Sequence, residues 1–231
     1  MIFEEGYIYH IYNQGNNKQK VFFSRDNYLF FLRKIRTHLL PYVDVLAYCL
    51  MPNHFHLMVL VRRVSVKTVG VTGSHADSKR MGTVGVTPSD TDSSRSDADS
   101  DTPSDADSGK VRTLNDSIGI LLRSYTRAVN IKLNRSGKLF REKTKSECIN
   151  CPQGLAPSFF TENGVTVINV ELPERQYPQV CFKYIHLNPV RAGLVSKPEE
   201  WEFSSAPDYA GVRNGTLINR KVAGEYVDTK V

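Results

Sequence analysis

The segment 50–61, which reads LMPNHFHLMVLV, constrains the fold more than any other part of the chain. From residue 53 onward its side chains alternate as in a β-strand, where successive side chains point to opposite faces. His54 and His56 would then share one face, about 7 Å apart at roughly 3.3 Å per residue. The other face would carry Phe55, Leu57, Val59 and Val61. Two imidazoles on a rigid strand can converge on one metal ion, although a bare His-x-His also occurs in ordinary surface histidines.

The segments around this strand predict a mixed architecture. Aromatic and β-branched residues favour strands, apolar residues at helical spacing favour helices, and Pro41 and Asn188-Pro189 are expected to end helices. The expected strands are 6–13, 43–50, 53–61 and 138–149, and the expected helices are 26–40, 113–134 and 176–186. The order strand, helix, strand, strand, helix, strand predicts an α+β, ferredoxin-like split βαβ fold. Its sheet would be mainly antiparallel, with helices on its face.

Two insertions are expected in an otherwise single domain spanning 1–231. Residues 64–109 are rich in Ser, Asp, Thr and Pro, and the pentapeptide TVGVT at 68–72 recurs at 83–87. Such a segment buries too little apolar surface to offset its ordering entropy, so we expect a disordered acidic insertion. Residues 150–173 form a second, shorter insertion, in which Val165–Ile168 is expected to be a small strand.

Charge is distributed unevenly along the chain. Residues 74–108 hold eight aspartates against three basic side chains, a net charge of −5. The other residues then hold 27 basic and 16 acidic side chains, a net charge of +11. A body this basic favours a polyanionic partner, with a solvated basic surface as the alternative.

The rest of the sequence indicates in which part of the cell the chain is expected. It contains no run of roughly 18 apolar residues, as a membrane span requires, and residues 1–5 lack the basic-then-apolar layout of a secretory signal. We therefore expect a cytoplasmic protein without a membrane partner. Four cysteines in a chain of 231 residues do not indicate a disulfide framework. Cys148 and Cys151 have zinc-like spacing without a second pair nearby, so reduced thiols and a structural zinc are both open.

If His54 and His56 bind a divalent cation, phosphoryl chemistry becomes accessible. Imidazole suits transition ions, and Mn²⁺ or Mg²⁺ is expected once an oxygen donor joins; such an ion polarises a phosphoryl group. Tyr125 is the candidate nucleophile, because Arg123 and Arg127 flank it on a basic helix and favour its ionisation. Tyr125 also fits the apolar stripe of that helix, so a packed core aromatic is the alternative.

Five segments carry a more specific signal. They are 9–17 (YHIYNQGNN), 47–56 (AYCLMPNHFH), 124–130 (SYTRAVN), 137–140 (GKLF) and 184–195 (YIHLNPVRAGLV). In this order they resemble the motifs of REP-associated tyrosine transposases, which belong to the single-tyrosine HUH transposases. The resemblance runs from about Tyr7 to Trp201, interrupted by the two insertions.

The resemblance implies cleavage and rejoining of single-stranded DNA. His54 and His56 would be the metal pair for Mg²⁺ or Mn²⁺, and Tyr125 would attack a phosphodiester to give a 5′-phosphotyrosine link and a free 3′-OH. The third metal ligand of the family is a polar side chain one turn beyond the tyrosine. Val129 stands there and cannot coordinate a metal, so Asn130 is the nearest polar substitute.

The resemblance also implies a DNA partner, single-stranded or folded as a hairpin such as a REP element, and a monomer or a homodimer. Basic side chains would then contact DNA phosphates. These are Lys18, Lys20, Arg123, Arg127, Arg141, Lys143 and Lys145. Two other functions stay open: a catalytically inactive hairpin-DNA-binding protein of the same fold, and a module stabilised by zinc at Cys148 and Cys151.

Overall fold

The computed structural model describes residues 1–68, 110–151, 159–162, 165–168 and 177–230. The chain divides into two compact units, one of Met1–Val66 with Arg112–Val231 and one of Lys67–Val111. The strands β4 (Ser65–Thr68) and β5 (Lys110–Thr113) pair in a two-stranded sheet.

A four-stranded antiparallel sheet forms the middle of the larger unit. Its strands are β1 (Ile8–Gln14), β2 (Val43–Met51), β3 (His54–Val61) and β6 (Lys145–Cys148), in the order β2-β3-β1-β6. β3 lies antiparallel between β1 and β2, so these two strands run parallel and are joined through α1 (Arg25–His38). This is the split βαβ arrangement, and the predicted α+β fold is confirmed.

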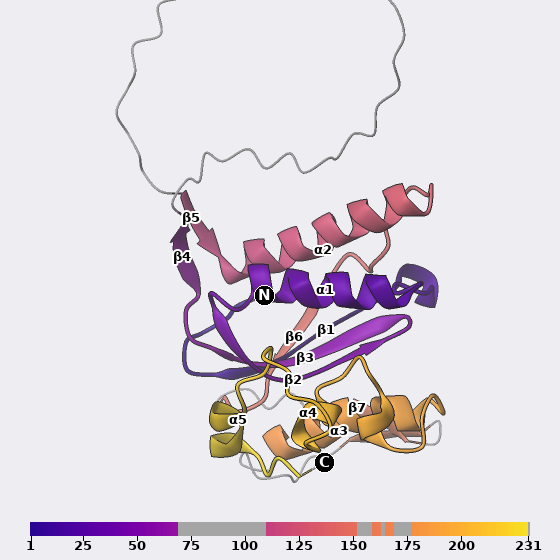
Figure 1. Ribbon diagram of the computed structural model, residues 1–231. Coiled ribbons are helices and arrows are strands. Elements are labelled where there is room, and N and C mark those ends of the chain that lie inside the picture. The colour runs from indigo at the N-terminus through magenta and orange to yellow at the C-terminus, as the bar shows by residue number, and fades with distance from the viewer. Residues whose placement is uncertain (69–109, 152–158, 163–164, 169–176, 231) are drawn as a thin grey trace, which may run out of the picture. The chain divides into compact units, whose positions relative to one another are not determined.

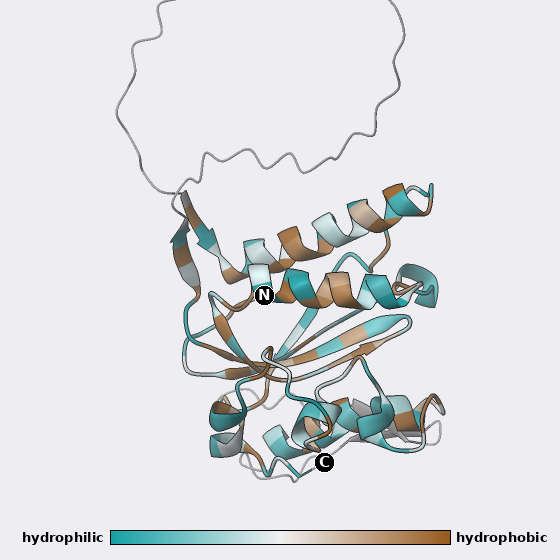
Figure 2. Ribbon diagram, in the orientation of Figure 1, coloured by the Kyte–Doolittle hydropathy of each residue, from teal (hydrophilic) through white to brown (hydrophobic). Residues whose placement is uncertain are grey.

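Helices cover both faces of this sheet (Figure 1). α1 and α2 (Leu114–Lys132) pack on one face, and α3 (Tyr177–Arg191), α4 (Ala206–Tyr209) and α5 (Arg220–Tyr226) lie on the other. Figure 2 shows hydrophobic segments along the strands between these two helical layers. Two separate hydrophobic clusters result. Phe55, Leu57 and Val59 of β3 join Phe31 and Ile35 of α1 in the first, and Met58 joins Phe182 and Ile185 of α3 in the second.

The helices begin where local sequence satisfies their first N–H groups. Thr113 caps α2: its Oγ1 accepts from the Asp116 backbone N–H at 3.1 Å, and the Asp116 carboxylate accepts from the Thr113 N–H at 3.0 Å. Ser24 and Asn27 form the same capping box at the start of α1. Each such cap stabilises its helix by about 1 kcal/mol.

The strand expected over 138–149 is confined to Lys145–Cys148. Leu139 and Phe140 are adjacent in sequence yet both belong to the first hydrophobic cluster, whereas a strand would turn them to opposite faces. The backbone before β6 is held instead by Asn13, whose amide donates to the Arg141 carbonyl at 3.1 Å and to Thr144 Oγ1 at 2.9 Å.

The helix expected over 176–186 continues to Arg191, with Pro189 inside it. Asn188-Pro189 therefore does not end the helix. A proline removes a single backbone donor, and the bonds beyond it persist: the N–H of Ala192 reaches the Asn188 carbonyl at 3.0 Å and that of Leu194 the Pro189 carbonyl at 3.0 Å. The extension makes Asn188 a helical residue, one turn after Tyr184.

Parts of both expected insertions lie outside the described residues. Residues 69–109 are not described, and the preceding residues 65–68 form β4 rather than part of a disordered segment. In the second insertion, β7 (Phe159–Glu162) and β8 (Val165–Ile168) form an antiparallel hairpin, which confirms the small strand, and the residues around the hairpin are not described.

Cys148 and Cys151 are joined by a disulfide bond, so the expectations of reduced thiols and of a zinc site at this pair are wrong for this structure. Cys49 and Cys181 are free and buried. Among the helices that the structure describes, none combines the length and the apolar composition of a membrane span.

The segment after α3 is fixed by a charged pair, which gives a first prediction. The Asp208 carboxylate is almost fully buried and accepts from Arg213 Nη2 at 2.7 Å, from Arg213 Nε at 2.8 Å and from the Gly215 N–H at 2.8 Å. Arg213→Ala would leave this carboxylate buried without its cation, and we expect a loss of about 3 kcal/mol in the free energy of unfolding. Urea unfolding measures the loss. Lys221→Ala, at an exposed position, should change it by less than about 0.5 kcal/mol, and an equally small change for Arg213→Ala would contradict the prediction.

Candidate active site

The two histidines of β3 lie on the sheet face that α3 covers. His54 stands opposite Gln14 of β1 and His56 opposite Tyr12. Their ring centroids are 4.9 Å apart, so the spacing expected from the sequence is close enough for both rings to approach one ion. His56 is only 5% exposed, whereas His54 is partly open to solvent.

His10 of β1 orients the His56 ring. His10 Nε2 and His56 Nδ1 are 2.9 Å apart and share one hydrogen bond. The other nitrogen, His56 Nε2, is buried and has no hydrogen-bond partner among the described residues. Burial lowers the pKa of His10 to about 4 and holds the pKa of His56 well below 6.5, with the neighbouring histidines as smaller causes for His56. Both rings are therefore neutral at pH 7. When Nδ1 of His56 donates to His10, Nε2 carries the lone pair that a metal ion requires.

His54 is held by two amides. Its Nδ1 lies 2.6 Å from Asn53 Oδ1, and its side chain also hydrogen-bonds to Asn188 of α3. Burial lowers the pKa of His54, and the bond to Asn188 opposes that shift.

Tyr184 stands beside the same histidines. Its ring centroid is 5.3 Å from that of His56 and 6.2 Å from that of His10, and the Arg191 guanidinium lies over the ring at 5.7 Å. Burial raises the pKa of Tyr184, whereas a hydrogen bond with Asn188 opposes that shift. Asn188 thus joins the phenol of Tyr184 to the imidazole of His54, and its place one helical turn after Tyr184 explains how it reaches both.

His54, His56 and Tyr184 line a cavity of about 250 Å³, which we call the histidine pocket. It is lined by Tyr12, Asn13, Gln14, His54, Phe55, His56, Arg141, Lys143, Lys145 and Tyr184. Arg141, Lys143 and Lys145 are exposed and basic, so three of the predicted DNA-binding residues lie beside the histidine pair.

Tyr12 is a second phenol in this pocket, but its hydroxyl is differently bonded. It donates to Glu147 Oε1 at 2.6 Å. Burial and this hydrogen bond to a carboxylate both raise the pKa of Tyr12. Burial raises the pKa of both phenols, but the contact with Asn188 opposes that shift at Tyr184 whereas the contact with Glu147 adds to it at Tyr12, so Tyr184 is the better nucleophile of the two.

The expectation that Tyr125 meets the histidine pair is wrong. Tyr125 is 0% exposed and belongs to the first hydrophobic cluster, under α1 and α2, whereas the histidines lie on the opposite face of the sheet. Its hydroxyl donates to the Val21 carbonyl at 2.7 Å, and burial strongly raises its pKa. Tyr125 is the packed core aromatic that its place in an apolar stripe also allowed.

Asn130 lies on α2, as Tyr125 does. The sheet therefore separates Asn130 from the histidines as well. Its amide nitrogen donates to the Gly137 carbonyl at 2.9 Å, which ties the end of α2 to the following loop. Val129, the residue one turn after Tyr125, is buried in the same cluster. The spacing of four residues between a tyrosine and a polar side chain was present elsewhere in the sequence, at Tyr184 and Asn188, and sequence reasoning overlooked it.

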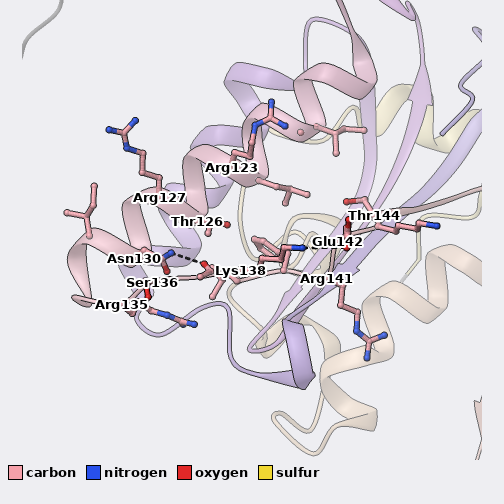
Figure 3. A pocket seen from close by; sticks show the side chains of 18 of the residues that line it. Arg123, Thr126, Arg127, Asn130, Arg135, Ser136, Lys138, Arg141, Glu142 and Thr144 are labelled. Atoms are coloured by element: carbon pink, nitrogen blue, oxygen red, sulfur yellow. Dashed lines mark hydrogen bonds and ion pairs between the residues drawn. The ribbon is translucent and has the colours of Figure 1, made fainter.

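The other predicted DNA-binding residues lie outside the histidine pocket. Arg123 and Arg127 line a second, larger cavity beside α2 (Figure 3), which Arg141 and Lys143 also line. Lys18 and Lys20 are exposed in the loop after β1, and the Lys18 carbonyl accepts from the Asn53 amide at 3.4 Å. The predicted residues thus occupy three neighbouring parts of the structure rather than one patch.

The donors around the pocket fit a divalent cation. No group of three His, Cys, Asp or Glu side chains that could hold a metal occurs in the described part of the chain. His54, His56 and Asn188 nevertheless offer two imidazoles and one amide oxygen as metal ligands. The Nε2 atom of His56 has no hydrogen-bond partner among the described residues, so its lone pair is available to a cation. Such a mixed nitrogen and oxygen set suits Mn²⁺ or Mg²⁺ with water and phosphate oxygens completing the coordination.

Comparison with known proteins gives one structural likeness. No family model matches the chain, and no curated protein matches it. A solved structure of a REP-associated tyrosine transposase bound to a REP hairpin aligns with 95% of this chain and 92% of its own, at 11% sequence identity and a TM-score of 0.47. Given that distance, the chemistry of this chain is inferred from its own residues.

The neutral buried histidines predict a loss of stability in acid. The folded pKa is about 4 for His10 and about 3 for His186, against 6.5 in an unfolded chain. The unfolded state therefore takes up protons first, so the free energy of unfolding should hold above about pH 6.5. Below that it should fall toward pH 4, by up to roughly 1 kcal/mol per pH unit for each histidine. Urea unfolding between pH 7.5 and pH 4.5 measures the slope. His10→Gln, which removes one titrating ring, should flatten it, and an unchanged slope would count against His10.

Proposed function

We propose that this chain is a metal-dependent endonuclease and strand transferase acting on single-stranded DNA, with Tyr184 as its nucleophile. The observation that carries the proposal is the pair of hydrogen bonds made by Asn188, one to His54 and one to Tyr184. They join the phenol of Tyr184 to the imidazole of His54, and both side chains line one pocket with His56 and with the basic Arg141, Lys143 and Lys145. This combination suits attack on a phosphodiester and has no evident structural purpose.

His54, His56 and Asn188 would hold Mg²⁺ or Mn²⁺. When bound, the cation polarises a phosphoryl oxygen and stabilises negative charge on the leaving oxygen. His10 keeps the Nδ1 atom of His56 engaged, so that Nε2 is directed away from the His10 bond. Such indirect contacts fix the ring orientation of a ligand and raise its affinity for metal.

Tyr184 would attack the phosphorus atom through its hydroxyl oxygen. A bond forms between that oxygen and phosphorus while the bond from phosphorus to the 3′ oxygen breaks, which leaves a 5′-phosphotyrosine link and a free 3′-OH. The phenolic proton passes to solvent water, with Asn188 opposing the effect of burial on the pKa of Tyr184, and the departing 3′ oxygen takes up a proton from solvent water. The number of phosphodiester bonds is unchanged, so a second strand end can reverse the step without ATP.

Arg141, Lys143 and Lys145 would hold the phosphates on either side of the reacting one. All three are exposed, line the pocket and make no side-chain ion pair with a described residue. The resemblance of five segments to REP-associated tyrosine transposases supports the same substrate class, and it extends to hairpin DNA. The segment 184–195 holds both Tyr184 and Asn188, so the family motif and the pocket geometry agree once Tyr125 is replaced by Tyr184.

Substitution of single tyrosines tests the nucleophile. Incubation with single-stranded hairpin oligonucleotides and Mn²⁺ should produce a covalent protein–DNA adduct, detected as a band shift in denaturing gels. Tyr184→Phe should abolish the adduct, by at least about 10³-fold in rate, because the attacking oxygen is gone. Binding of the oligonucleotide should persist.

Two matched tyrosines serve as controls. Tyr125→Phe should keep the adduct and lose about 1–2 kcal/mol in the free energy of unfolding, because the buried Val21 carbonyl loses its donor. Tyr12→Phe should keep the adduct as well. An adduct that survives Tyr184→Phe, or that disappears in Tyr125→Phe while the protein stays folded, would sink the assignment. Hairpin binding without any adduct in the unaltered protein would instead favour a DNA-binding protein that has lost catalysis.

The proposed metal donors give a separate prediction. Asn188→Ala and His56→Ala should each weaken Mn²⁺ binding by roughly tenfold or more, measured by titration calorimetry. His38→Ala, which removes a histidine on α1, should leave the affinity unchanged. Equal affinities for all three variants would show that the cation binds elsewhere.

A further inference from the structure

A large groove lies beside α2, next to the histidine pocket. It has a volume of about 1510 Å³ and lies between α2 and the segment 134–144. Sites for small molecules usually measure about 300–1,000 Å³. The size of this groove therefore fits an extended polymer better than a compact ligand.

The rim of the groove is strongly basic. Six basic residues line it, Arg123, Arg127, Arg135, Lys138, Arg141 and Lys143, against one acidic residue, Glu142. The Glu142 carboxylate is paired with Lys138 Nζ at 3.5 Å, and Arg135 donates to Gln19 at 2.9 Å. Among the described residues, the side chains of Arg123, Arg127, Arg141 and Lys143 make no hydrogen bond or ion pair. In Figure 3, Arg123 and Arg127 extend from α2 on one side and Arg141 from the opposite segment. Four unpaired cations around one groove indicate an anionic occupant.

The interior of the groove is apolar. Ile118 and Leu122 contribute to it from α2, and Leu139 and Phe140 from the segment opposite. Ile118, Leu139 and Phe140 are almost fully buried, whereas Leu122 is partly exposed and Ile131 of α2, which also lines the groove, is 72% exposed. Leu122 and Ile131 therefore give the groove accessible apolar surface beside its basic side chains, which matches a polymer with charged phosphates and exposed hydrophobic bases. A duplex keeps its bases stacked inside and presents mainly phosphates, so this apolar surface favours an unpaired strand.

The groove and the histidine pocket share two residues. Arg141 and Lys143 line both cavities, so a strand whose phosphate lies at Tyr184 can pass these two side chains and continue along α2. We propose that this groove binds the unpaired single-stranded DNA that flanks the reacting phosphate. One part of this proposal rests on the proposed function, namely that the end of the strand lies at Tyr184.

Fluorescence anisotropy measures the affinity of the protein for a labelled oligothymidylate of about 20 nucleotides. EDTA in the buffer removes divalent cations, so binding to the groove is tested without cleavage of the DNA. The double variant Arg123→Gln/Arg127→Gln removes two phosphate contacts. It should lower the affinity on the order of tenfold at 0.1 M salt and reduce the slope of log affinity against log salt by about 1.4. The same length of duplex, and the same length of abasic strand, should bind the unaltered protein more weakly than the oligothymidylate.

A matched control removes the same charge elsewhere. Arg63 and Lys221 are exposed, line none of the cavities described above, and carry the same charge. Arg63→Gln/Lys221→Gln should change the affinity less than twofold. The proposal is overturned if the control variant loses as much affinity as the groove variant, if the groove variant binds like the unaltered protein, or if duplex binds as tightly as single strand.

Adduct formation separates this proposal from the function on which it builds. With a hairpin that carries a long unpaired tail, Arg123→Gln/Arg127→Gln should raise the half-saturating DNA concentration for adduct formation on the order of tenfold. Absence of any adduct in the unaltered protein, together with the expected anisotropy results, would refute the nuclease and keep the groove. A normal adduct with no effect of the groove variant in either assay would refute the groove and keep the nuclease.

Discussion

The alternation of side chains along β3 is the constraint on which the rest of the structure depends. Phe55, Leu57 and Val59 must be buried under α1 and α2, and this fixes His54 and His56 on the other face. A shift of one residue in the register would exchange the two sets and bury the imidazoles in an apolar cluster. Helices cover both faces of the sheet, so each face has its own hydrophobic core. The face under α1 and α2 is apolar, and the core on the face under α3 ends at the polar histidine pocket.

The polar pocket is assembled from three elements that approach each other only in the folded chain. β3 supplies the histidine pair, β1 supplies His10, and α3 supplies Tyr184 and Asn188. Burial keeps His10 and His56 neutral, and Nε2 of His56 is buried without a hydrogen-bond partner among the described residues. An unpaired buried polar atom costs on the order of 1–3 kcal/mol, so its persistence is easier to understand as a binding feature than as a structural one.

Periodicity in the sequence was sufficient to predict the three central strands of the sheet and the face on which the histidines lie, since both follow from the local alternation of side chains. It was insufficient for the nucleophile. Tyr125 and Tyr184 each stand on a helix with an apolar side, and the sequence of a helix does not reveal which face of the sheet it covers. Pro189 added a second difficulty, because it suggested a helix end before Asn188. The disulfide between Cys148 and Cys151 was missed for a related reason: spacing alone does not distinguish a zinc pair from a bonded one.

α3 brings Tyr184 to the β3 histidines of its own chain, so the proposed nucleophile and the histidine pair belong to the same molecule. Under the proposed function, no exchange of helices between two copies would be needed to complete this set of reacting groups. Turnover per molecule would then be independent of protein concentration.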